Sequence, residues 1–257
     1  MKLENRVAIV TGGAMGIGKG IAAVFLDEGA KVVIADVNRE AGEKTAAELR
    51  RDGRELEFIE CDVANEAAIK QMVAGTLDRF NALHVLVNNA AIGVYKPVLD
   101  TSTEEWDRCM AVNLRGVFLC SKYSLPHIKA AGGGAIVNIA SVHSYQNVGG
   151  TAPYAASKGG VAALTRVMAI DHGKDKIRVN AICPGWIYTP LIQGIFAGDP
   201  DPEKAKAAVE RRQILGRLGT PEEVGQAAAF LASDESSYIT GASLMVDNGM
   251  TALLETW

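Results

Sequence analysis

Short apolar runs alternate with amphipathic stretches along almost the whole chain. The apolar runs occupy residues 6–11, 31–36, 55–61, 84–87, 135–140, 177–182 and 243–247, and their length is typical of strands buried on both faces. Helical periodicity predicts helices at 21–29, 39–51, 66–80, 153–172, 203–212 and 221–231, and one long helix at 103–129. This alternation predicts an α/β fold, with helices on both faces of one doubly wound parallel sheet of about seven strands.

The chain contains no repeat, linker or low-complexity tract, so residues 1–257 are expected to form one domain. The helical pattern weakens at 190–217, where Gly194 and Pro202 are among the residues that interrupt it. Because this stretch follows a strand end, we interpret it as a lid over a substrate; a solvated helical excursion is the alternative. A short apolar tail ends at Trp257.

The composition is typical of a globular cytoplasmic protein. Of the 257 residues, 48% are hydrophobic and 22% are charged, which is enough apolar material for a substantial core. The net charge of −4 gives no general attraction to nucleic acid or to an anionic membrane. No apolar run has membrane-spanning length, and the first residues do not resemble a signal peptide, so we expect a cytoplasmic location.

The cysteines and histidines do not predict a metal site. The four cysteines are scattered without CxxC spacing, and we interpret them as reduced core residues. The four histidines form no ligand pattern such as HExxH, so no metal is expected.

A glycine-rich turn separates the first predicted strand from the first predicted helix. Gly12, Gly16 and Gly18 let the backbone turn tightly and approach a pyrophosphate, which the helix N-terminus stabilises. Asp36 ends the second strand at the spacing expected for a carboxylate that binds the adenosine ribose hydroxyls. The combination predicts dinucleotide binding rather than a purely structural turn.

Other polar residues follow the strands at the same edge of the sheet. Asp62 ends the third strand and would bond the adenine ring, although a helix-capping role is nearly as plausible. Asn88 follows the fourth strand and suits either a cofactor contact or a structural amide between the central strands. Asn113 has apolar neighbours, so it is expected to be buried and hydrogen-bonded. Ser141 follows the fifth strand.

Tyr154 and Lys158 are the residues most suggestive of chemistry. Four residues apart on a predicted helix, their side chains share a face. The pKa of an unperturbed phenol is about 10, and a fixed ammonium nearby lowers it, which suggests proton transfer to or from a substrate oxygen. Taken alone, the pair is equally compatible with an ordinary helix surface.

Together these motifs resemble the short-chain dehydrogenase/reductase family in its single-domain, Rossmann-type form, over essentially the whole chain. Thr11, Gly12, Gly16, Ile17 and Gly18 match the cofactor turn of that family, and Asp62 matches its adenine-side acid. Asn88, Asn89 and Ala90 match its central-strand motif, although Ala91 stands where glycine is more usual. The matches to its catalytic tetrad are Asn113, Ser141, Tyr154 and Lys158, and those to its nicotinamide-side loop are Pro184, Gly185 and Thr189.

The resemblance implies a role for each member of the tetrad. Tyr154 would exchange the alcohol proton, Ser141 would bond the substrate oxygen, and Lys158 would bind the nicotinamide ribose and lower the pKa of the tyrosine. Asn113 would position a water that relays protons. The residues expected to hold the cofactor are Gly12, Met15, Gly16, Ile17, Gly18, Asp36, Asp62, Val63, Asn89, Ala90, Tyr154, Lys158, Pro184, Gly185, Ile187 and Thr189. A homotetramer associating through helices 104–130 and 153–172 is also implied.

The expected cofactor is NAD, because Asp36 would repel the 2′-phosphate of NADP, and Val37 stands where NADP-preferring relatives often carry arginine. Arg39 would soften this preference. The expected substrate is a small secondary alcohol or its ketone, such as a sugar, polyol or sugar acid, contacted by His143, Gln146 and Trp186. The alternatives are an NADP-dependent ketoacyl-carrier reductase and a nucleotide-sensing protein without catalysis.

Overall fold

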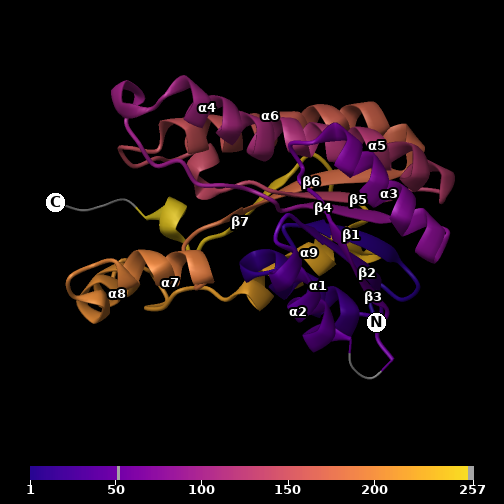
Figure 1. Cartoon of the computed structure of the whole chain (residues 1–257), viewed down its shortest axis with the longest axis horizontal. Coiled ribbons are helices and arrows are strands. Elements are labelled where there is room, and N and C mark those ends of the chain that lie inside the picture. The colour runs from indigo at the N-terminus through magenta and orange to yellow at the C-terminus, as the bar shows by residue number, and fades with distance from the viewer. Residues whose placement is uncertain (51–52, 254–257) are drawn as a thin grey trace.

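A parallel sheet lies at the centre of the molecule and confirms the predicted fold class (Figure 1). The computed structural model describes residues 1–50 and 53–253. The strand order is β3-β2-β1-β4-β5-β6-β7, so the connections reverse direction beside β1. The strands are β1 (Val7–Thr11), β2 (Lys31–Asp36), β3 (Leu56–Glu60), β4 (Val85–Asn88), β5 (Gly134–Ile139), β6 (Ile177–Pro184) and β7 (Ser243–Val246).

Helices cover both faces of the sheet and bury apolar side chains against each of them (Figure 1). One face is covered by α1 (Gly16–Asp27), α2 (Arg39–Leu49) and α9 (Pro221–Ala232), and the other by α3 (Glu66–Phe80), α5 (Gly116–Ala130) and α6 (Ala152–His172). The predicted end of the second helix at Arg51 and the tail at Trp257 lie outside the described residues. Short 3₁₀ turns occupy Val98–Asp100, Val142–Ser144, Gly173–Asp175, Asp234–Ser236 and Met250–Ala252.

The prediction of one long helix at 103–129 is wrong in one respect. The stretch consists of α4 (Thr103–Met110), a π-helical turn (Ala111–Arg115) and α5. The wider turn contains Asn113, whose side-chain amide accepts from the N–H of Ile92 at 2.8 Å and donates to its carbonyl at 2.9 Å. A π turn inside an α-helix often marks a functional position, and here it holds Asn113 against the loop that follows β4.

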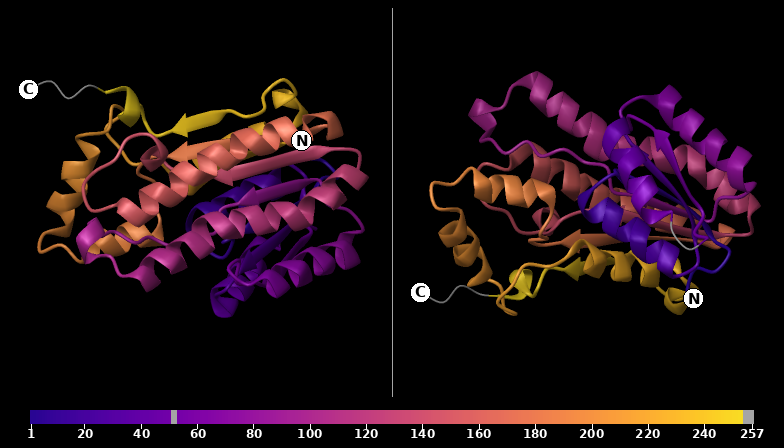
Figure 2. Two further views of the ribbon diagram at one scale, coloured as in Figure 1. Left: turned by 90° about the horizontal axis from the view of Figure 1, so that it is seen from above. Right: turned by 60° about the horizontal axis from the view of Figure 1, so that its bottom comes forward.

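The predicted lid (residues 190–217, the lid segment) contains two short helices, where the sequence indicated only the second. They are α7 (Pro190–Ala197) and α8 (Pro202–Glu210), and both lie beyond the carboxyl ends of the strands (Figures 1 and 2). Proline starts each helix, and the side chains of Thr189 and Asp201 cap them.

The middle of the sheet is held by a buried chain of amides. Asn88 donates to Asn138 at 2.8 Å and to Ser121 at 3.2 Å, and Asn138 donates to Thr165 at 2.8 Å. These bonds tie β4 and β5 to α5 and α6, so Asn88 is the structural amide that the sequence left open.

The four cysteines are free and buried, as the sequence suggested. Within the described part of the chain, no helix has both the length and the apolar character needed to cross a bilayer.

Candidate active site

The glycine turn after β1 has the shape that a pyrophosphate needs. Gly12 and Gly16 have φ angles of +63° and +54°, which favour glycine. A Cβ at Gly18 would overlap the carbonyl oxygen of Gly12. Met15 precedes α1 without capping it by its side chain, so N–H groups of the first turn remain available to an anion. The backbone therefore fits the diphosphate of a dinucleotide.

Asn89 and Ala90 support this turn from the end of β4. The Asn89 side chain donates to the carbonyls of Thr11 and Gly12, both at 3.0 Å. A Cβ at Gly12 would lie 2.8 Å from the Cα of Ala90, so the two backbones pack directly. Asn89 thus shapes the cofactor turn with its side chain. Ala91, the departure from the family motif, is not among the residues with a positive φ, so it needs no glycine there.

The end of β2 places one carboxylate beside the turn. Asp36 accepts from the N–H of Ala14 at 3.1 Å and from that of Asn38 at 3.0 Å. The neighbouring Val37 is 63% exposed. Arg39 does not face this carboxylate as a free charge, because it pairs with Glu60 at 2.6 Å. The local charge at the ribose position is therefore negative.

Asp62 lies at the end of β3 and is already engaged by the protein. It accepts from the N–H of Ala64 at 2.8 Å and from Arg108 at 3.3 Å. The helix-capping alternative is wrong, because the side chain of Asn65 caps α3. The Asp62 carboxylate is partly exposed, and its contact with an adenine ring stays a prediction. Val63, the next residue, is buried.

The segment after β6 closes the opposite end of the site. Gly185 packs against Asp247, where a Cβ would lie 2.9 Å from the Asp247 Cα. Ile187 pairs with Gly219 in a bridge that uses the Trp186 carbonyl and the Tyr188 N–H, so both backbone groups of Ile187 face away from it. A Cβ at Gly16 would touch Thr189 at 3.4 Å. The predicted nicotinamide side therefore adjoins the glycine turn; Pro184 ends β6 just before it.

Ser141, Tyr154 and Lys158 come together from β5 and α6. Lys158 is buried and donates from Nζ to the carbonyl of Ile139 at 2.7 Å. Its Nζ lies 5.7 Å from the centre of the Tyr154 ring. The buried Ser141 hydroxyl bonds the Tyr154 phenol and accepts from the N–H of His143 at 3.1 Å. This arrangement brings the hydroxyls of Ser141 and Tyr154 together beside the Lys158 ammonium.

The expectation that Lys158 lowers the pKa of Tyr154 is wrong for the protein chain itself. Burial raises the pKa of the Tyr154 phenol, nearby Tyr95 raises it further, and the hydrogen bond with Ser141 opposes the rise only in part. Burial also lowers the pKa of Lys158 to about 8, which means that the charged form of this side chain is destabilised by its surroundings. Desolvation is therefore the main cause of both shifts, and neither group is among the causes of the shift of the other.

Asn113 is connected to Tyr154 through Ser157 of α6. Its side chain also donates to Ser157 at 3.1 Å, and Ser157 donates to the Tyr154 carbonyl at 2.7 Å. With the two bonds to Ile92, this amide links the π turn to the first turn of α6. The predicted burial and hydrogen bonding of Asn113 are confirmed, whereas its role in a proton relay stays a prediction.

Tyr95 was not among the residues expected at the site. Its ring centre lies 5.4 Å from that of Tyr154, and 48% of the residue is exposed. Gly93 allows this position, because a Cβ there would lie 2.5 Å from the Tyr95 ring. No motif includes this residue; its only signal was an aromatic side chain shortly after the Asn88–Asn89 turn.

Two of the three predicted substrate residues lie near the site, and Gln146 does not point into it. The His143 ring meets the Tyr154 ring edge-on at 5.8 Å. Trp186 stacks on Phe196 of α7 at 6.3 Å and anchors the lid segment. Gln146 instead donates to the Thr251 carbonyl at 2.9 Å, because the C-terminal segment passes beside this loop.

Known proteins match this chain in sequence and in structure over almost its whole length. The family model described as enoyl-(acyl carrier protein) reductase matches residues 12–251. Cyclopentanol dehydrogenase of Comamonas testosteroni is 41% identical over 251 residues, which is 98% of this chain and 99% of that protein. Meso-2,3-butanediol dehydrogenase of Serratia marcescens is 40% identical over 252 residues, 98% of this chain and 97% of that protein. The crystal structure of levodione reductase superimposes with a TM-score of 0.93 at 33% identity, covering 98% of this chain and 100% of the other.

Burial of Lys158 predicts a pH-dependent stability. Its folded pKa of about 8 lies below its ordinary 10.5, so between these values the unfolded chain binds a proton that the folded chain has lost. Stability must then rise with pH across this window. Between pH 7 and pH 10, the free energy of unfolding of wild type, measured in urea, should therefore rise by about 2 kcal/mol relative to that of Lys158→Met.

The control is Lys174→Met, which removes an exposed lysine and should show no such shift. A difference between wild type and Lys158→Met that stays constant with pH would contradict the lowered pKa.

Proposed function

The chain belongs to the short-chain dehydrogenase/reductase family, and we propose that it is an NAD(H)-dependent oxidoreductase interconverting a small secondary alcohol and its ketone. Dehydrogenases of this family use nicotinamide cofactors. The observation that carries the proposal is the meeting of Ser141, Tyr154 and Lys158 beside the glycine turn. A nucleotide-sensing protein would need the turn but not a phenol and a serine aimed at one oxygen.

The residues of the chain perform the proton chemistry, while the bound nicotinamide supplies the hydride acceptor or donor. In ketone reduction, Tyr154 donates its proton to the substrate oxygen, and its raised pKa keeps that proton in place at neutral pH. Ser141 bonds the same oxygen and fixes its position. In alcohol oxidation, Tyr154 must first lose its own proton to solvent, and the resulting phenolate then accepts the alcohol proton. Lys158, with a pKa of about 8, can release and regain a proton near neutral pH.

The charge around Asp36 supports NAD as the cofactor. Its carboxylate stands at the end of β2, while the nearby Arg39 is paired with Glu60 at 2.6 Å and faces Glu43 at 3.7 Å. Val37 offers no cation. A 2′-phosphate at this position would meet a carboxylate without a compensating positive charge.

The walls of the site support a small substrate with both apolar and polar surface. Tyr95 and the Trp186–Phe196 pair supply aromatic surface, and His143 supplies a polar edge beside Tyr154. The expected row of polar contacts is reduced, because Ser144 and Gln146 donate to backbone carbonyls. Similarity to dehydrogenases named for cyclopentanol and 2,3-butanediol supports a compact secondary alcohol.

We propose in addition a homotetramer in the cytoplasm. An apolar groove lies between α6 and the stretch formed by α4, the π turn and the start of α5, and Phe118 and Val167, both about half exposed, line it. Ala163 is small and exposed, so a second copy can approach closely, and Asp107 and Arg115 in the same groove provide opposite charges for a twofold contact. The free cysteines suit a reducing compartment.

The phenol of Tyr154 should be essential to turnover and dispensable for folding. Tyr154→Phe keeps the ring contacts with Tyr95 and His143 but removes the proton, so kcat should fall by roughly 10²–10⁴-fold. NADH binding, measured by fluorescence, and Tm should stay near wild type. Tyr238→Phe removes a fully exposed phenol and serves as the control. Wild-type turnover in Tyr154→Phe would refute the mechanism.

The cofactor preference should depend on the charge of Asp36. We expect wild type to have a higher kcat/KM with NAD⁺ than with NADP⁺. Asp36→Asn keeps an acceptor for the backbone and removes the charge, so the preference should shrink about tenfold or more. Glu40→Gln removes an exposed charge on α2 and should leave the ratio unchanged. Equal kcat/KM values for both cofactors in wild type would exclude the assignment to NAD.

The substrate class should appear in a panel of secondary alcohols with NAD⁺, followed by NADH absorbance. We expect cycloalkanols, short diols and small hydroxy acids to have higher kcat/KM values than steroids or 3-hydroxyacyl thioesters. His143→Ala should weaken the more polar members selectively, and Tyr95→Ala should improve bulkier rings. A preference for hydroxyacyl thioesters would instead favour the ketoacyl-carrier reductase.

A further inference from the structure

The chain beyond β7 forms a rigid turn that we name the C-terminal strap (residues 247–251). The Asp247 carboxylate accepts from the N–H of Gly249 at 3.0 Å, and from the N–H and hydroxyl of Thr251 at 2.9 and 2.7 Å. Asn248 and Gly249 both have positive φ, 58° and 72°. Three bonds to one carboxylate hold these few residues in a single conformation.

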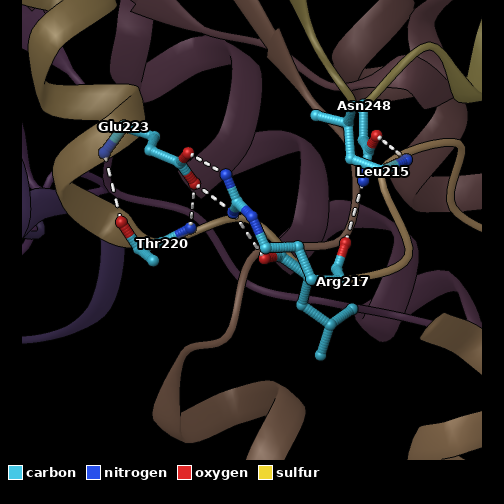
Figure 3. Close-up of polar contacts among 6 residues, drawn as sticks. Leu215, Arg217, Thr220, Glu223 and Asn248 are labelled. Carbon is cyan, nitrogen blue, oxygen red and sulfur yellow. Dashed lines mark hydrogen bonds and ion pairs between the residues drawn. The ribbon is translucent and has the colours of Figure 1, made fainter.

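One side of the strap grips the end of the lid segment (Figure 3). The Asn248 side chain accepts from the N–H of Leu215 at 2.8 Å and donates to the carbonyl of Arg217 at 2.9 Å. Gly249 lies against Ile214, where a Cβ would come within 2.6 Å of its Cδ1. The strap therefore fixes the backbone where the lid segment returns to the body of the protein.

Arg217, which accepts a hydrogen bond from Asn248, is also bonded to helix α9. Arg217 makes two bonds to Glu223, at 2.6 and 2.9 Å, and Glu223 also accepts from the N–H of Thr220 at 2.8 Å (Figure 3). Residues 217–223 are thus held to the helix layer. Asn248 connects this fixed point to the last residues of the lid segment.

The other side of the strap holds the loop that follows Ser141. Gln146 donates to the Thr251 carbonyl at 2.9 Å, across 105 positions of sequence. The hydroxyl of Tyr145 donates to Ser243 at the start of β7, at 2.8 Å. This loop begins with Ser141 and includes His143, the two residues that border the Tyr154 ring and phenol.

We propose that Asn248 and Gln146 are positioning residues that set the distance between the lid segment and the loop of residues 141–147 through the C-terminal strap. The proposal rests on the proposed function, because it assigns these two walls to one substrate. The strap touches both walls, while neither bond touches the reacting groups. A wall that moves away from the substrate loses contacts with it, so a fixed spacing between the two walls favours substrate binding.

The first test measures coupling without the reaction. Hydrogen exchange by mass spectrometry would compare wild type with Asn248→Gly, which keeps the positive φ and removes both side-chain bonds. Exchange should rise on the order of tenfold in residues 210–217 and also in residues 142–150, which Asn248 does not contact. Asn81→Gly, a change at another asparagine with φ 56° remote from the site, is the matched control and should alter neither. A rise confined to 210–217 would overturn the proposal.

The second test uses kinetics. Asn248→Gly and Gln146→Ala should each raise KM for the alcohol by roughly 3–10-fold, with kcat within about twofold and NADH binding unchanged. If one strap transmits both effects, the KM of the double variant should be no higher than that of the more impaired single variant. Additive losses, or unchanged KM values, would overturn the coupling. If the protein oxidises no alcohol at all, the proposed function is refuted. The hydrogen-exchange experiment would then still test the coupling between the lid segment and the loop of residues 141–147.

Discussion

The bond from the Lys158 ammonium to the carbonyl of Ile139 is the interaction on which the geometry of the site depends. It joins α6, which carries Tyr154, to the end of β5, which delivers Ser141. The chain of Asn88, Asn138 and Thr165 ties the same helix and strand together one layer deeper. Burial of a cation is costly, so the position of Lys158 beside a phenol supports the proposed proton chemistry rather than a contribution to stability.

Parallel strand pairing brings all the remaining groups to one place. Because every strand of the sheet runs in the same direction, the turn after β1, the acid after β2 and the loops after β4, β5 and β6 meet at the carboxyl edge. The close packing of Gly12 on Ala90 and the bonds from Asn89 then fix the turn against the central strand. The sheet thus determines where the loops of the site lie relative to one another.

Local patterns in the sequence were sufficient for the sheet, for most of its helices and for the placement of Tyr154 and Lys158 on one helix, because periodicity, glycine spacing and a four-residue spacing are local signals. Features that depend on distant contacts were not predictable. The π turn at Asn113 follows from bonds to Ile92, the placement of Gln146 from a contact with Thr251, and the packing of Tyr95 from the fold of its loop. The direction of the Tyr154 pKa was missed because sequence spacing reports a neighbouring charge but not the depth of burial.

The two helices of the lid segment carry their own start signals, in Thr189 with Pro190 and in Asp201 with Pro202. A lid made of irregular chain would have to lose the backbone freedom of each of its residues when it closes, at about 1–2 kcal/mol per residue. Here most of that entropy has already been lost in folding, so closure of the proposed lid would reorder only the joints between two preformed helices. The free energy of substrate binding would then be available to orient the substrate at Ser141 and Tyr154, because little of it is needed to order the proposed lid.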